Sequence, residues 1–109
     1  NMESRYELIS LIMMDLNNAK IKRACKEIGI NPVEVCTKDH NDFLNKEFLE
    51  ILLEEYEQIR NGIQHQMEYE STLPEYQWNG HYMPSDLWFE AEIEVNTLIA
   101  TMTDLMAML

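Results

Sequence analysis

The feature that most constrains the fold is a long amphipathic segment at residues 42–63. With successive residues about 100° apart around a helix axis, its large apolar side chains share one broad face. These are Leu44, Phe48, Leu49, Leu52, Tyr56, Ile59 and Ile63. Glutamates at positions 47, 50, 54 and 57 lie on the opposite face. The pattern predicts a long helix near 42–66 that packs one side on a core.

Two features of this segment do not fit a simple amphipathic helix. Glu55 lies at the edge of the apolar face, where a carboxylate is paired, placed at an interface or used chemically. Past position 63, Gln66 and Glu70 also fall on the apolar side. We expect the helix to continue through them, because Ile63 and Met67 maintain the apolar stripe.

A second long periodic segment is found near 85–108. Its apolar residues recur at steps of three and four, which predicts a helix: Trp88, Ala91, Val95, Leu98, Met102, Leu105 and Leu109. Phe89 and Ile93 fall together on the outer side of this helix. Large apolar groups on an outer face suggest a second contact surface.

The N-terminal region predicts two shorter helices, at residues 3–16 and 19–28. Their apolar stripes are rotated by roughly 110° relative to each other, which a single straight helix would not do. Asn17-Asn18 is the expected break or cap, and one kinked helix is the alternative. Gly29 is suited to ending the second helix, and a short helix at about 32–36 follows it.

These segments predict an all-α fold, a small bundle of four or five helices in a single domain over residues 1–109. The length and the 46% apolar content suit one modest core. Residues 71–84 contain two prolines and form an irregular aromatic loop in this prediction. Tyr76 and Trp78 lie in that loop and are candidate partner contacts.

Charge is distributed very unevenly along the chain. The net charge is −12, and residues 61–109 hold eight acidic residues and no Lys or Arg. Such a surface repels phosphates, so we expect no direct nucleic-acid binding and a protein partner with a basic surface. The expected partner-binding residues are acidic and apolar side chains on the two long helices, with the two loop aromatics: Glu50, Glu54, Glu57, Phe89, Ile93, Glu90, Glu94, Tyr76 and Trp78.

No sequence pattern indicates a catalytic site, a cofactor site or a membrane span. The three histidines are scattered, and Cys25 and Cys36 fit no metal-binding spacing. No run of 18 uncharged apolar residues is present, and the first residues lack the pattern of a secretory signal. We therefore expect reduced cysteines, a cytoplasmic location, and neither metal nor cofactor.

Residues 54–58, EEYEQ, resemble the EExxE motif of the all-α MazG-type nucleoside triphosphate pyrophosphohydrolases, with Gln58 in place of its last acid. That resemblance implies a helical, oligomeric enzyme whose Mg²⁺ is held by acids from two helices. In this sequence Glu50, Glu54, Glu55 and Glu57 would be the candidate ligands. The family's second motif, ExxD on a later helix, is absent, because Val95 follows Glu92 at the third position.

The function that the sequence favours is a non-enzymatic acidic helical interaction module. It would be an inhibitor that occupies a basic, nucleic-acid-binding surface of a partner, as small phage-type anti-defence proteins do. A Mg²⁺-dependent pyrophosphohydrolase is the first alternative, and a structural subunit of a larger assembly is the second. Surplus apolar residues at Leu8 and Leu11, and at Phe89 and Ile93, also suggest a homodimer.

Overall fold

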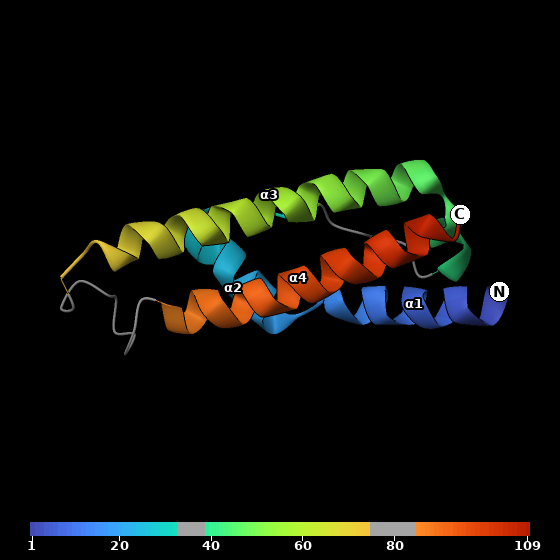
Figure 1. Ribbon diagram of the computed structural model, residues 1–109, viewed down its shortest axis with the longest axis horizontal. Coiled ribbons are helices and arrows are strands. Elements are labelled where there is room, and N and C mark those ends of the chain that lie inside the picture. Colours follow the sequence, from blue (N-terminus) through green and yellow to red (C-terminus); the bar gives the residue numbers. More distant parts are fainter. Residues whose placement is uncertain (33–38, 75–84) are drawn as a thin grey trace.

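The computed structural model is an elongated helical bundle and describes residues 1–32, 39–74 and 85–109 (Figure 1). Four α-helices and one short 3₁₀ helix make up the chain in these ranges: α1 (Met2–Asp15), α2 (Ala19–Ile28), η1 (His40–Leu44), α3 (Lys46–Ser71) and α4 (Ser85–Ala107). No strand occurs in the described residues. The predicted all-α bundle is confirmed, whereas the expected helix at 32–36 lies mostly outside the described residues.

The helix α4 is the element around which the others pack. It contacts α1, α2 and α3, whereas in the described part of the chain no Cα atom of α1 lies within 8 Å of α3. Figure 1 shows α1 on the side of α4 opposite α3, whereas α2 crosses behind and reaches α3, which it also contacts. The apolar stripe of α4 is accordingly wide, and Ala91, Val95, Leu98 and Met102 are each fully buried.

The predicted break between the first two helices is confirmed. The side-chain oxygen of Asn18 accepts hydrogen bonds from the backbone N–H groups of Lys20 and Ile21, at 2.9 and 3.1 Å, and so caps α2. Because the chain turns at this point, the stripes of both helices face α4 despite their different phases. Gly29 ends α2 in the left-handed conformation, with φ of 74°, as expected.

The predicted start of the central helix was wrong by a few residues. Residues 40–44 form η1, and Asn45 is extended and caps α3 through the backbone N–H of Phe48. The apolar periodicity spans this break because Phe43 of η1 is buried in the same core as α3. The helix then continues through Gln66 and Glu70 to Ser71, as expected from the apolar stripe that Ile63 and Met67 maintain.

The dipeptide Asn61-Gly62 forms no turn, because α3 continues through it. A Cβ atom added at Gly62 would lie 3.0 Å from Ile28 Cδ1 and 3.1 Å from Ile30 Cδ1. The glycine therefore permits a close approach between α3 and the end of α2. Neither of the long helices, nor any shorter helix in the described ranges, has the length and apolar composition needed to cross a membrane.

Candidate functional site

Three glutamates, Glu50, Glu54 and Glu57, form what we call the acidic row on α3. The side chains of Glu50 and Glu54 are exposed and that of Glu57 is half-buried. Their i, i+4 and i+7 spacing places them along about 10 Å of helix. In the described part of the chain none of the three makes an ion pair or a side-chain hydrogen bond. Their negative charge is therefore available to another molecule.

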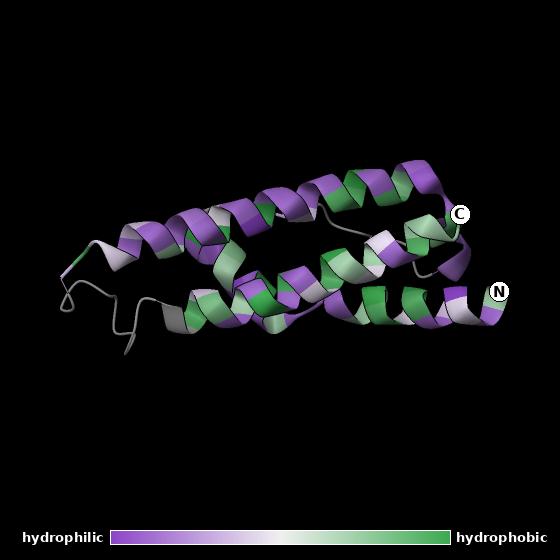
Figure 2. Cartoon of the chain, viewed as in Figure 1, coloured by the Kyte–Doolittle hydropathy of each residue, from purple (hydrophilic) through white to green (hydrophobic). Residues whose placement is uncertain are grey.

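The acidic row lies on the side of α3 that faces away from α4. The residues that contact the core, such as Leu52, Tyr56 and Ile59, are on the opposite side of the helix and are buried. Figure 2 shows how strongly hydrophilic residues dominate the visible surface of α3, in contrast to α1 and α4. The helix thus presents its acids on a rigid, regular backbone.

The anomalous carboxylate, Glu55, lies at the contact between α3 and α2. Burial raises the pKa of the Cys25 thiol on α2 to about 11, and the negative charge of Glu55 adds to that rise. Burial also raises the pKa of Tyr56 to about 12, with Cys25 and Glu55 as further causes. Of the placements expected for Glu55, the structure therefore shows an interface, the one between α3 and α2.

The four acids of the alternative metal site do not converge. In the parts of the chain that the structure describes, no group of three or more His, Cys, Asp or Glu side chains is arranged to hold a metal ion. Glu54 and Glu55 are adjacent in a helix and so point about 100° apart. The structure gives no support to a preassembled Mg²⁺ site at Glu50, Glu54, Glu55 and Glu57.

The two apolar residues expected on the outside of α4 are exposed. Phe89 retains 53% and Ile93 retains 49% of its accessible surface. They are four residues apart and therefore lie one turn apart on the same face. This pair is an apolar surface on α4, the helix that packs against the three other α-helices.

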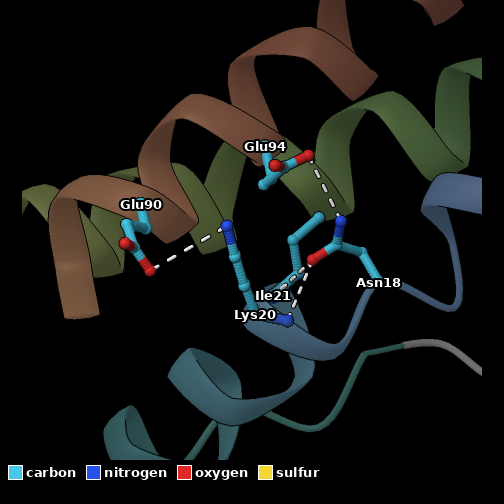
Figure 3. A network of polar contacts seen from close by, with 5 residues as sticks. All are labelled: Asn18, Lys20, Ile21, Glu90 and Glu94. Carbon is cyan, nitrogen blue, oxygen red and sulfur yellow. Dashed lines mark hydrogen bonds and ion pairs between the residues drawn. The ribbon is translucent and has the colours of Figure 1, made fainter.

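Glu90 and Glu94, which the sequence also placed in the partner-binding set, contact α2 (Figure 3). The Lys20 ammonium lies 3.9 Å from a Glu90 carboxylate oxygen, with both side chains more than half exposed. The Asn18 amide donates to Glu94 at 3.2 Å, while its oxygen caps α2. Glu94 thus helps to fix the start of α2, whereas Glu90 remains accessible from solvent.

A negative cluster accompanies this contact. Partial burial raises the pKa of Asp15, the last residue of α1, and the charge of Glu94 raises it further. The sequence did not indicate this proximity, because the two residues are 79 positions apart. Tyr76 and Trp78, the remaining members of the expected set, lie outside the described residues.

The core contains a buried carboxylate, Glu70, whose position was predicted from the sequence but whose hydrogen-bond partners were not. Glu70 falls on the apolar face of α3 as predicted, and it is 3% exposed. Its carboxylate accepts hydrogen bonds from the indole N–H of Trp88 and from the amide of Gln66. The requirement of a buried indole for an acceptor could have suggested the pairing from sequence.

Comparisons with protein-family models, with curated proteins and with solved structures give no match for this chain.

Proposed function

We propose that this chain is a non-enzymatic interaction module whose acidic row binds a basic surface of a partner protein. In that proposal it acts as an inhibitor that occupies a nucleic-acid-binding site, as small phage-type anti-defence proteins do. The observation that carries the proposal is that Glu50, Glu54 and Glu57 share one face of a long helix and have no ion pair or side-chain hydrogen bond with any residue that the structure describes. Because the helix already fixes the backbone of the three residues, binding has to order only their side chains.

The charge distribution supports the same proposal. The chain has no Lys or Arg after Arg60, so its C-terminal half cannot neutralise the acidic row from within. A field of one sign speeds the encounter with an oppositely charged site and makes binding sensitive to salt. A partner site that normally holds phosphates offers the required arginines and lysines.

Neither alternative function is favoured by a specific contact. A pyrophosphohydrolase of the MazG type would need acids gathered from two helices, and the described carboxylates do not gather in this way. A structural subunit would bury exposed apolar surface in its assembly. Exposed large apolar side chains occur on α1, α3 and α4, at Leu11, Ile51 and Phe89 among others, and none of them singles out a subunit role.

The test uses immobilised protein to capture partners from native lysate. The variant combines Glu50→Gln, Glu54→Gln and Glu57→Gln. A control with the same change in net charge combines Glu3→Gln, Glu7→Gln and Glu27→Gln, which are exposed acids on α1 and α2. We expect a partner that is retained by the wild type and the control, and retained about tenfold less by the acidic-row variant.

Two further measurements decide between binding and inhibition. The captured partner should elute as salt rises, and duplex DNA or RNA should compete with the wild-type chain for it. Equal retention by all three proteins would remove the acidic row from the interaction. Salt-insensitive capture, or a partner whose nucleic-acid binding is unaffected by the chain, would overturn the proposed inhibition.

A further inference from the structure

The outer face of α4 has a graded pattern of side-chain size. Phe89, Ile93, Ala100 and Ala107 follow one another at spacings of four, seven and seven residues, so they form one stripe along the helix. All four are exposed. The large side chains occupy the N-terminal half of the stripe and the small ones the C-terminal half. No residue of α4 from Val95 to Thr103 is charged.

We propose that this stripe binds a second copy of the same chain, with the two α4 helices packed antiparallel about a two-fold axis. The axis lies between the two exposed stripes, at the level of Leu98 along each helix. A large-to-small gradient is self-complementary only in the antiparallel arrangement. Phe89 of one copy then faces Ala107 of the other, and Ile93 lies beside the partner's Thr103 and Ala100. Large side chains opposite small ones allow two helices to approach closely, without voids or clashes.

Charge selects the same arrangement. Asp104 is the one charged residue between Val95 and Leu109, and it is exposed. It follows Glu90 by 14 residues, close to four turns, so it lies on the flank of α4 that faces α1 and α2. Lys20 contacts Glu90 on this flank and is 51% exposed. The two-fold axis brings Lys20 of each copy toward Asp104 of the other, which adds two symmetric ion pairs.

The size of the contact sets its strength. The 23 residues of α4 extend over about 34 Å, and the edges of α2 and α3 flank them. A contact made mainly along one helix of this length buries an area at the lower end of the range for specific interfaces. We therefore expect a dimer that dissociates on dilution. The symmetry also leaves both α3 helices on one side of the dimer, where the two acidic rows double the charge that a partner meets.

Sedimentation velocity over a range of concentrations tests the dimer. The wild type should approach twice the 12.9 kDa mass of the chain as concentration rises. Ile93→Glu should weaken association by about tenfold or more. The matched control is Ile51→Glu, because Ile51 is an exposed isoleucine on α3, remote from the stripe, with 59% of its surface accessible. It should dimerise like the wild type.

A charge exchange tests the orientation. Lys20→Glu and Asp104→Lys should each weaken the dimer, and the double variant should recover it, with far-UV circular dichroism confirming that each variant is folded. A wild type that is monomeric at every concentration, equal effects of the two isoleucine variants, or no recovery in the double variant would overturn the proposal. None of these outcomes bears on the acidic row, so the proposed function is tested separately.

Discussion

The indole N–H of Trp88 donates a hydrogen bond to the carboxylate of Glu70, and both residues are buried. This contact joins the last turn of α3 to the first turn of α4, on either side of residues 75–84. Gln66 donates a second hydrogen bond, at 3.3 Å, to the other carboxylate oxygen. A buried carboxylate is tolerated here because donors meet both of its oxygens.

Removing the indole donor should therefore destabilise the fold. We expect Trp88→Phe to lower the free energy of unfolding by about 3 kcal/mol, from the lost hydrogen bond to a buried charge and the smaller ring. Urea denaturation followed by far-UV circular dichroism measures the change. The same substitution in a Glu70→Gln background should cost about half as much, because no charge is then left underpaired. Equal losses in both backgrounds would show that Trp88 acts through packing alone.

Arg5 connects the start of α1 to the end of α4. Its Nη2 donates to the backbone carbonyl of Met108 at 2.6 Å, where a positive charge also meets the negative end of the α4 dipole. We expect Arg5→Gln to lower the free energy of unfolding by about 1–2 kcal/mol. The exposed Arg23 is the control, and Arg23→Gln should change stability by less than about 0.5 kcal/mol. Similar effects of the two substitutions would contradict the capping role.

Alkaline pH should weaken the contact between α2 and α3. The folded protein raises the pKa of Cys25 from 9.0 to about 11 and that of Tyr56 from 10.0 to about 12. The unfolded chain releases these protons first, so their contribution to stability is complete below pH 9 and is lost as pH rises toward 12. Urea midpoints measured from pH 7 to 11.5 should fall above pH 9. Cys25→Val should make that fall shallower, and an unchanged pH profile would refute the assignment.

The carboxylate of Asp15 should destabilise the folded protein at neutral pH. Burial and Glu94 both raise its pKa, and it stands at the C-terminal end of α1, where the helix dipole disfavours a negative charge. Asp15→Asn should therefore increase the free energy of unfolding by a few tenths of a kcal/mol at pH 7. Because a raised pKa penalises only the ionised form, the gain should vanish near pH 3. A gain that persists at low pH would point to a cause other than charge.

The spacing of apolar residues was sufficient to predict the helices that bury a single apolar face in the core. The apolar stripe that ends at Ile63 predicted α3, and the one that begins at Trp88 predicted α4. The change in stripe direction at Asn17-Asn18 predicted the break before α2. The start of α3 was missed because Asn45 interrupts the helix without interrupting burial: Phe43 and Phe48 both contact the core on either side of it. A hydrophobic pattern records burial and does not record backbone conformation.

The surroundings of individual carboxylates could not be predicted in the same way. Glu55 and Glu70 both stood out as acids near the apolar face, yet one lies beside a thiol of α2 and the other accepts from an indole of α4. These partners are 30 and 18 residues away, so only the packing of helices brings them together. The exposure of Phe89 and Ile93 was predicted, because it depends on α4 alone.

The central position of α4 has a consequence for how the chain acquires its fold during synthesis. The ribosome makes residues 85–107 after α1, α2 and α3, yet α1 packs against no α-helix other than α4 in the described structure. Until α4 is released, α1 can pack only against η1, so most of its apolar face is uncovered and invites premature association with other chains. The complete core can therefore form only after α4 is made, and a premature stop codon before it would leave α1, α2 and α3 without the helix that all three contact.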